Sequence, residues 1–406
     1  MTYSSKWDTK PLKHIALINP DADEELSDGT IVKQVNLDKL KPYSKFIDGF
    51  DTVEFDGKGS KFRNNDTLVP KISSALVNGK TAFVNVLDEG EIGIGSSWFI
   101  VLRGIDNICD PDFLYYLATT PWFRELAGKT LEGSTKSRYI NINILKEYEF
   151  QIPAYEEQHR LASVLKVIDD KIDKNIKVCA AIEKILERIF HDRFNKYNFH
   201  NQELPQGWRQ GFLYEIGDIV AGSTPSKKVT EYYSDCSIPW ITPRDLSKQG
   251  TKFISKGAID ITEKGLNNCS ASKLPRGTVL FSSRAPIGYV AIASNELVTN
   301  QGFRSIVPFS GVGSTFVYYL LCSKIDEIIN MATGSTFKEI SGQALKKLKI
   351  IVPDKTFLTS FDKHTMGLMR YQENIESENH LLGRIRDNLL PLLISGALRV
   401  YSGDNK

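Results

Sequence analysis

The sequence lacks the marks of an exported, disulfide-bonded or membrane-spanning protein. It has only five cysteines, at Cys109, Cys179, Cys236, Cys269 and Cys322. An odd number of widely separated cysteines argues against a disulfide framework and against the close pairs of a zinc site. No run approaches 18 consecutive apolar residues, and residues 1–13 lack the apolar core of a signal peptide. We therefore expect a cytoplasmic protein that makes no membrane contact.

The motifs of common catalytic sites are also lacking. Gly79-Lys80-Thr81 resembles the end of a phosphate-binding loop, but Ser74 stands where that loop requires glycine. Gly93-Ile94-Gly95 lacks the third glycine of a dinucleotide-binding turn. The sequence has no Asn-Pro-Pro-aromatic or Asp-Pro-Pro-aromatic tetrad, which a base-amine methyltransferase would use, and no convincing carboxylate set for a nuclease. We expect no catalytic residue, metal or cofactor in this chain.

The overall charge is nearly balanced. The 51 Lys and Arg against 49 Asp and Glu leave a net charge of +2, which is too little to indicate nucleic-acid binding by bulk charge. Basic residues nevertheless gather locally: residues 226–286, Lys252 among them, hold ten Lys or Arg against five Asp or Glu. Several stand in stretches such as residues 57–61 and 282–284 that look like loops. Basic loops suit contacts to phosphates and base edges, although solvated surface lysines would produce the same composition.

The second half of the chain repeats short markers of the first half. Gly133-Ser134-Thr135 returns as Gly334-Ser335-Thr336, and Leu145-Lys146 and Pro153 return as Leu345-Lys346 and Pro353. A Phe-x-Tyr-Tyr-Leu sequence occurs at residues 113–117 and again at residues 316–320. A period of about 200 residues indicates a duplicated domain, since solenoid repeats recur every ~20 to 50 residues.

A long helix is predicted after each proline, from Glu156 to about Phe194 and from Thr356 to about Ile394. In the first helix, apolar residues recur at spacings of four and three, which is the heptad pattern of a coiled coil. Its seam is Leu161, Leu165, Ile168, Ile172, Asn175, Cys179, Ile182, Leu186 and Ile189. The second seam is Phe361, His364, Leu368, Tyr371, Ile375, Glu378, Leu382, Ile385, Leu389 and Leu392, and it is more polar at Thr365, Gln372 and Asn379. A single polar seam residue such as Asn175 commonly fixes register or orientation.

The expected fold is α+β, with two β-rich domains separated by two long helices that pair as an antiparallel coiled coil. Short runs rich in β-branched and aromatic residues predict strands at residues 81–87, 98–102, 277–281 and 289–292. The predicted boundaries are 1–153 for the first domain, 154–200 for the central helical region, 201–353 for the second domain and 354–406 for the C-terminal helical region. About 36 residues at ~1.5 Å each would hold the two domains roughly 54 Å apart, or about 16 base pairs.

The candidate nucleic-acid contacts combine the basic residues with the repeated Gly-Ser-Thr loops, which could also be plain turns. In the first domain they are Lys61, Arg63, Lys71, Lys80, Ser134, Thr135, Lys136 and Arg138. In the second domain they are Lys227, Lys228, Arg244, Arg276, Arg284, Gln301, Ser335, Thr336 and Lys338. Gln301 is included because a glutamine amide can make two hydrogen bonds to the major-groove edge of adenine, at N6 and N7.

The order of these features resembles the DNA-specificity subunit of type I restriction-modification systems. The residues that carry the resemblance are 204–208, 216–219, 221–225, 238–241, 284–288 and 299–302 in the second domain, 66–72 and 78–82 in the first, and the junction from Pro153 to Glu157-Gln158. The second helix departs from the family pattern because Asp354-Lys355-Thr356 replaces the Glu-Gln pair. The two domains also diverge between their shared markers.

The resemblance implies a non-catalytic subunit that binds double-stranded DNA and reads an asymmetric target of two half-sites, one for each target-recognition domain. The implied partners are two modification subunits, which use S-adenosylmethionine to methylate adenine, and two restriction subunits, which use ATP and magnesium. Two alternatives from the residues alone are a two-headed coiled-coil adaptor that binds proteins and a self-contained enzyme such as a nuclease.

Overall fold

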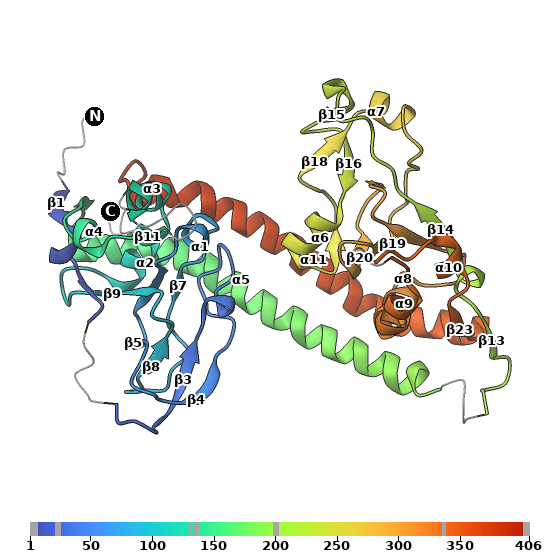
Figure 1. The fold of residues 1–406 in the computed structure, drawn as a ribbon, viewed down its shortest axis with the longest axis horizontal. Helices are drawn as coiled ribbons and strands as arrows, with labels where there is room; N and C mark the ends of the chain where they lie inside the picture. The colour runs from blue at the N-terminus through green and yellow to red at the C-terminus, as the bar shows by residue number, and fades with distance from the viewer. Residues whose placement is uncertain are drawn as a thin grey trace, which may run out of the picture. The chain divides into compact units, whose positions relative to one another are not determined.

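The fold is α+β, and its elements fall into two compact units (Figure 1). A computed structural model describes residues 7–20, 26–129, 131–132, 138–197, 203–334 and 338–400. Unit 1 comprises Met1–Lys174 and Asn379–Lys406, and unit 2 comprises Asn175–Glu378. Each unit therefore contains one β-rich domain together with part of each long helix. Among the described residues, no helix combines the length and the apolar character that crossing a membrane requires.

The β-rich domain of unit 1 is built around two four-stranded sheets, ordered β2-β9-β6-β7 and β4-β3-β8-β5. Its elements are β1 (Asp8–Pro11), η1 (Leu12–His14), β2 (Ala16–Ile18), β3 (Ile31–Val35), η2 (Leu37–Lys39), β4 (Asp51–Glu54), β5 (Ser60–Phe62), β6 (Thr67–Pro70), α1 (Ser73–Val77), β7 (Ala82–Phe83), β8 (Gly93–Gly95), β9 (Phe99–Gly104), α2 (Pro111–Thr119), α3 (Pro121–Lys129), β10 (Leu131–Glu132), β11 (Tyr139–Ile140), α4 (Ile142–Leu145) and β12 (Glu149–Ile152). Two short antiparallel pairs, β1-β12 and β10-β11, complete it.

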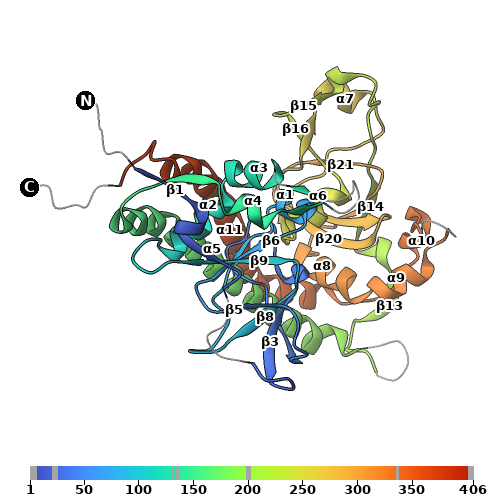
Figure 2. The same ribbon diagram turned by 60° about the vertical axis from the view of Figure 1, so that its left-hand side comes forward.

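The β-rich domain of unit 2 holds a five-stranded sheet, β14-β22-β19-β20-β17, and a four-stranded sheet, β15-β18-β16-β21. Its elements are β13 (Arg209–Phe212), η4 (Leu213–Glu215), β14 (Gly217–Ala221), η5 (Thr230–Tyr232), β15 (Tyr233–Ser234), β16 (Ile238–Ile241), α6 (Pro243–Gln249), β17 (Phe253–Ile254), β18 (Ile259–Ile261), α7 (Glu263–Asn267), β19 (Val279–Ser283), β20 (Ile287–Ala293), β21 (Val298–Thr299), β22 (Arg304–Pro308), α8 (Ser314–Ser323), α9 (Ile325–Met331), α10 (Gly342–Lys346) and β23 (Lys349–Val352). Figure 2 shows β15, β16 and α7 at the end of this domain remote from α8 and α9.

Three of the four predicted strands are confirmed, as β9, β19 and β20, and the repeated Phe-x-Tyr-Tyr-Leu segments lie in α2 and α8. The strand predicted at residues 81–87 is wrong beyond β7. The Asn64 side chain bonds both the carbonyl and the N–H of Leu87, at 2.8 and 3.2 Å, so side-chain bonds replace the strand ladder there. The loops predicted at residues 57–61 and 282–284 are also partly wrong, because Lys61 lies on β5 and Ser282 and Ser283 lie on β19.

The two long helices are confirmed as α5 (Tyr155–Phe190), which continues as a π-helical turn over His191–Asn195, and α11 (Lys355–Ile394). In unit 1, Arg386 Nη1 lies 2.8 Å from Asp169, and Leu161 and Leu165 share a core with Leu393 and Ile394. Later residues of α5 thus meet earlier residues of α11, as antiparallel pairing requires.

The two helices also pair antiparallel in unit 2. The Asn175 amide donates to Glu378 at 2.8 Å, and the rings of Phe190 and Phe361 lie 6.2 Å apart. Asn175 is buried on the seam, so its bond to Glu378 favours one register of the helix pair.

The predicted seam of α5 is buried or half-buried along its whole length, and so are Phe361, Leu368, Ile375, Leu382 and Leu389 of α11. The other apolar positions predicted for the second seam are wrong, because Tyr371, Ile385 and Leu392 are exposed. Between the confirmed positions, the buried face of α11 includes Thr365 and Gln372, two of the polar seam positions expected from the sequence, and Glu376. Polar residues carry no apolar periodicity, so the pattern chose the neighbouring apolar residues there.

Candidate nucleic-acid interface

In both units, the segment that follows the Gly-Ser-Thr repeat is hydrogen bonded to the end of a central strand. In unit 1, the Ile140 N–H donates to the Lys71 carbonyl at 2.9 Å, just after β6. In unit 2, the Ile340 N–H donates to the Ser283 carbonyl at 3.0 Å, at the end of β19. These bonds place Arg138 beside the Lys71 segment and Lys338 beside Arg284. The candidates Ser134, Thr135, Lys136, Ser335 and Thr336 lie outside the described residues.

The unit 1 surface combines two cations with two aromatic rings. The Lys71 ammonium lies 5.5 Å from the centre of the Tyr139 ring, and the Lys71 N–H donates to the Trp98 carbonyl at 2.7 Å. Trp98 is 48% exposed, and Arg138 is exposed. Sequence reasoning missed Trp98 and Tyr139. Trp98 stands at the end of a predicted strand and Tyr139 shortly after a repeated loop, and these positions could have indicated both residues.

The remaining candidates of unit 1 are engaged elsewhere in the domain. Lys61 lies over the Phe55 ring at 5.9 Å, and Lys80 donates to the Leu37 carbonyl at 2.9 Å. The Arg63 backbone N–H donates to the buried Asp66 carboxylate at 2.7 Å. The structure therefore does not join these three residues to the Lys71 surface.

The unit 2 surface is organised by one carboxylate. Glu339 lies 3.4 Å from an Arg284 guanidinium nitrogen and 3.2 Å from one of Arg304. Arg304 also donates to the carbonyls of Gln301 and Phe303, at 3.2 and 2.8 Å. The side chains of Gln301 and Thr224 are hydrogen bonded to each other. Arg284 and Gln301, predicted separately, thus belong to one cluster, and Arg304, Glu339 and Thr224 are its additional members.

Close packing brings the neighbouring loops to this cluster. A side chain at Gly222 would place its Cβ 2.1 Å from the Asn300 carbonyl oxygen, so only glycine fits where residues 222–224 approach Gln301. The Pro243 ring packs on Gly302. Pro243 is the first residue of α6, and the next residue, Arg244, is exposed. These contacts place the Arg244 segment next to the cluster.

The other basic residues of unit 2 lie in different surroundings. Arg276 contacts the Ser294 carbonyl and Glu373 of α11, which separates it from the Arg284 cluster. Lys252, counted among the surface charges, is buried and paired with Glu183. Lys227 and Lys228 are exposed in a turn before η5. The basic surface of unit 2 is therefore smaller than composition indicated.

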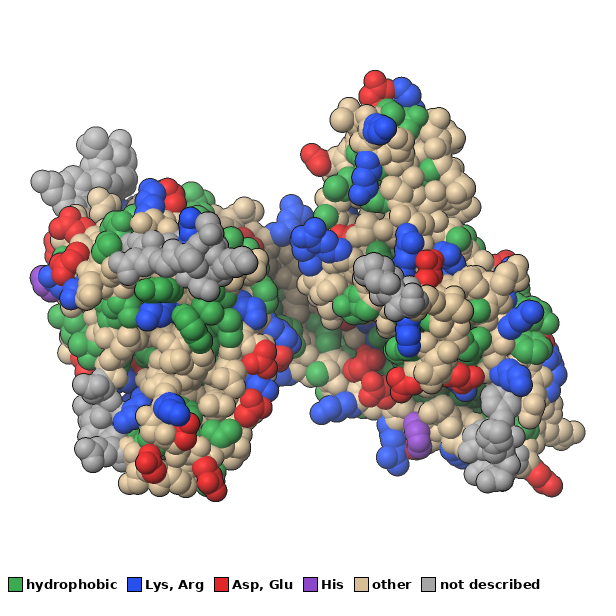
Figure 3. Space-filling model, viewed as in Figure 1, with side chains coloured by type: hydrophobic (Ala, Val, Ile, Leu, Met, Phe, Trp, Pro, Cys, Tyr) green, Lys and Arg blue, Asp and Glu red, His purple; other side chains and the backbone are tan. Residues whose placement is uncertain are grey.

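The chemistry of the two surfaces suits a polar, charged ligand. Guanidinium groups and amides can bond base edges or phosphate oxygens, and exposed aromatic rings provide stacking surfaces. Figure 3 shows Lys and Arg side chains mixed with Asp and Glu over the visible faces of both units. Local geometry, and not a uniform positive field, must then provide any selectivity. Throughout the described ranges, no group of three or more His, Cys, Asp or Glu side chains is placed to hold a metal ion.

Comparison with known proteins gives consistent matches to one family. Residues 51–184 and 205–379 match the type I restriction modification DNA specificity domain. The chain is 42% identical over 192 residues to the type I restriction enzyme MjaIX specificity subunit of Methanocaldococcus jannaschii, a match that covers 45% of this chain and 43% of that protein. It is 25% identical to the HindI specificity subunit of Haemophilus influenzae, over 79% of this chain and 84% of that protein.

A solved structure supports the fold. The type I restriction-modification S subunit from M. genitalium aligns with 97% of both chains at a TM-score of 0.60 and 18% sequence identity. The two matched segments fall one in each half of the chain and together cover most of it. The duplicated β-rich domains, the antiparallel helices and these matches show that this chain belongs to the type I restriction-modification DNA-specificity family.

Proposed function

We propose that this chain is the DNA-reading subunit of a type I restriction-modification complex. It binds double-stranded DNA without catalysing a reaction and recognises a target of two half-sites separated by a spacer. Each β-rich domain reads one half-site, and the paired helices set the spacer length. The observation that carries this proposal is the duplicated pairing of residues 138–140 and 338–340 with a strand end that bears candidate DNA contacts.

The two half-sites should differ in sequence because the two surfaces differ in chemistry. Unit 1 presents Lys71 and Arg138 with the exposed Trp98 and the half-buried Tyr139. Unit 2 presents Arg284 and Arg304 around Glu339, next to the Gln301 amide. An arginine pairs best with guanine and a glutamine amide with adenine in the major groove. Surfaces with different sets of donors and acceptors favour different base sequences, so the proposed target is asymmetric.

The partners are proposed to dock on the exposed apolar side of the helix pair. In unit 1, Val167 of α5 and Leu381 and Ile385 of α11 are exposed. In unit 2, Ile185 of α5 and Tyr371 of α11 are exposed. A contiguous exposed apolar patch marks a protein-binding surface, and we propose that these side chains contribute to one such patch in each unit. One such surface in each unit agrees with two modification subunits for each specificity subunit.

Catalysis is assigned to these partners. Two modification subunits would bring S-adenosylmethionine for adenine methylation, and two restriction subunits would bring ATP and magnesium. This chain would direct both activities to its target in the cytoplasm, without a cofactor of its own.

The deciding experiment is a map of methylated adenines in cells that express this chain together with its neighbouring methyltransferase. A matched strain lacks this chain alone. We expect a two-part asymmetric motif that disappears when the chain is deleted. That map would provide both half-sites and the spacer together. An active methyltransferase with the same motif in both strains would refute the proposal and favour a protein-binding adaptor.

A further inference from the structure

Within the described ranges, each unit contains one buried lysine, and the two lie in equivalent short segments. Lys45 is 1% exposed and Lys252 is 5% exposed. They begin the sequences Lys45-Phe46-Ile47 and Lys252-Phe253-Ile254, which follow a serine and a threonine, respectively. Buried lysines are rare, and they need a partner that offsets the loss of water. Two of them at matching positions indicate a shared role.

The backbone contacts of the two segments are also the same. The Ser44 hydroxyl donates to the Phe46 carbonyl at 3.2 Å, and the Thr251 hydroxyl donates to the Phe253 carbonyl at 3.0 Å. The carbonyls of Lys45 and Lys252 each accept a backbone N–H at 2.8 Å, from Phe83 and from Ile292. Both segments run parallel to the strand that donates this bond. The Lys-Phe-Ile sequence is therefore a duplicated structural element.

The repeated tyrosine pair covers each ammonium group. In unit 1, the Lys45 nitrogen lies 4.8 Å from the centre of the Tyr116 ring and 5.4 Å from that of Tyr115. In unit 2, the Lys252 nitrogen lies 4.7 Å from the Tyr319 ring and 4.8 Å from the Tyr318 ring. Cation–π contacts of this kind are strongest when the cation is desolvated. The Phe-x-Tyr-Tyr-Leu repeat thus does more than fill the core.

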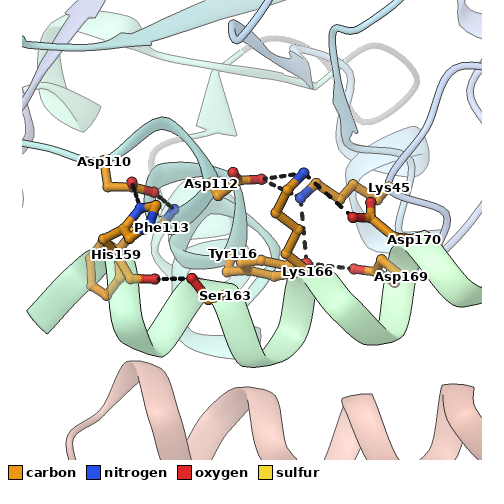
Figure 4. Close-up of polar contacts among 10 residues, drawn as sticks. All are labelled: Lys45, Asp110, Asp112, Phe113, Tyr116, His159, Ser163, Lys166, Asp169 and Asp170. Carbon is orange, nitrogen blue, oxygen red and sulfur yellow. Dashed lines mark hydrogen bonds and ion pairs between the residues drawn. The ribbon is translucent and has the colours of Figure 1, made fainter. Parts of the chain in front are cut away.

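In each unit, a carboxylate of α5 accepts a hydrogen bond from the second tyrosine hydroxyl of the repeat. The Tyr116 hydroxyl donates to Asp169 at 2.8 Å, and Lys45 is paired with Asp112 of α2 (Figure 4). The Tyr319 hydroxyl donates to Glu183 at 3.0 Å, and Lys252 pairs directly with Glu183. Lys252 also lies 2.6 Å from the Tyr319 hydroxyl. These polar contacts connect each β-rich domain to α5.

The other helix, α11, holds the backbone of the same segment. In unit 1, Arg386 donates to the Tyr43 carbonyl at 2.9 Å and to Asp169 at 2.8 Å. In unit 2, Glu376 accepts the N–H groups of Phe253 and Lys252 at 2.9 and 3.4 Å. The charge of the α11 residue is opposite in the two units, and it bonds a carbonyl two residues before Lys45 in unit 1 but the N–H groups of the lysine segment itself in unit 2. The lysine segment of unit 2 is therefore bonded directly to both helices, whereas in unit 1 α5 and α11 are linked to it through Tyr116 and Tyr43.

Burial of a lysine ammonium group costs free energy unless its partners keep their geometry. Desolvation lowers the pKa of Lys45 against the raising effect of Asp112, and it lowers the pKa of Lys252 against that of Glu183. An apolar residue of similar volume would avoid this cost, so a gain in stability is a weak explanation for these two buried lysines.

We propose that Lys45 and Lys252 are positioning residues, each fixing the angle at which its recognition domain is held on the two helices. This inference rests on the proposed function and goes further, because it assigns part of the spacer measurement to the joints between domain and helices. A domain that rocks on its helices can meet a half-site displaced by one base pair, about 3.4 Å along the DNA. Loss of either lysine then relaxes the spacer while the bases read in both half-sites stay the same.

The test uses the full chain with its methyltransferase in cells and compares wild type with Lys252→Met by methylation mapping. We expect Lys252→Met to raise methylation at least ~fivefold at targets whose spacer differs by one base pair, since one to two kcal/mol changes an equilibrium by that factor or more. Lys45→Met should do the same, and the double variant should accept more spacer lengths than either. The exposed Lys347, in the same unit as Lys252, provides the matched control, Lys347→Met.

Thermal unfolding of the purified complexes separates loss of folding from loss of positioning. Tyr319→Phe removes only the hydroxyl between Lys252 and Glu183, so it should keep the fold and relax the spacer more weakly. A folded Lys252→Met with the wild-type spacer would overturn the inference. Should Lys252→Met fail to fold, an unchanged spacer in Tyr319→Phe would overturn it equally. A wild-type complex without any two-part motif would instead refute the proposed function.

Discussion

At the scale of single residues, the two units begin their long helices with different chemistry. Gln158, on the first turn of α5, is fully buried. Its amide donates to the carbonyls of Ile108 and Pro153 at 2.9 Å and accepts the Asp110 N–H at 3.0 Å. In unit 2, Asp354 caps α11 through the Phe357 N–H at 2.9 Å and accepts the Trp208 indole N–H at 3.1 Å. The missing Glu-Gln pair is thus replaced by a different set of bonds.

We predict that Gln158→Ala destabilises unit 1 by about 2 to 4 kcal/mol, because it leaves buried backbone groups without a partner. The measurement is thermal or denaturant unfolding of the purified chain. Glu156→Ala, an exposed change on the same helical turn, is the control and should leave stability within about 0.5 kcal/mol of wild type. Equal stability of the two variants would show that the Gln158 bonds contribute little.

At the scale of secondary-structure elements, apolar periodicity predicted α5 better than α11. The seam of α5 is apolar except at Asn175, so its pattern indicated the correct face. The buried face of α11 includes Thr365, Gln372 and Glu376, whose burial depends on partners far away in the sequence. Gln372 bonds Glu376, which in turn holds the backbone at Phe253. Periodicity cannot reveal such contacts, because each polar residue alone indicates exposure.

The paired helices make the spacer measurement testable. The notable contacts near the unit boundary are Asp169–Arg386 in unit 1 and Asn175–Glu378 in unit 2. Four residues inserted after Lys174 alone would lengthen α5 but not α11. The two interhelical contacts could then no longer form together, because they lie on opposite sides of the insertion. We therefore predict that matched insertions of four residues, after Lys174 and after Glu378, lengthen the recognised spacer by about two base pairs, from ~6 Å of added helix.

Methylation mapping of the doubly extended chain checks this prediction. Both half-sites should keep their bases, because the insertions lie outside the two β-rich domains. The single insertion after Lys174 is the comparison, and it should reduce methylation overall. A doubly extended chain that folds and methylates targets with the original spacer would show that the helices do not set it.

At the scale of the whole molecule, duplication was readable in the sequence, but the composition of each site was not. The markers at Gly133 and Gly334 predicted two equivalent surfaces, and equivalent strand-end pairing is found at Ile140 and Ile340. The charge count included Lys252, which is buried, and could not separate Arg276 from Arg284. The Lys-Phe-Ile repeat could not be identified from the sequence, because a match of three residues is too short to be significant. Only the backbone contacts show that the two segments are equivalent.

The separate cores of the two units predict that damage to one reading surface stays local. Arg284 belongs to the Glu339 cluster of unit 2, and a well-placed arginine contributes about 1 to 3 kcal/mol of discrimination against the wrong base. Arg284→Ala should relax base preference at one position of one half-site and leave the other half-site and the spacer unchanged in the methylation map. Arg209→Ala, an exposed arginine of the same unit paired with Glu215, is the control. Equal weakening on specific and non-specific DNA would make Arg284 a phosphate contact, because a residue that bonds only the backbone lowers affinity without altering the sequence that is read.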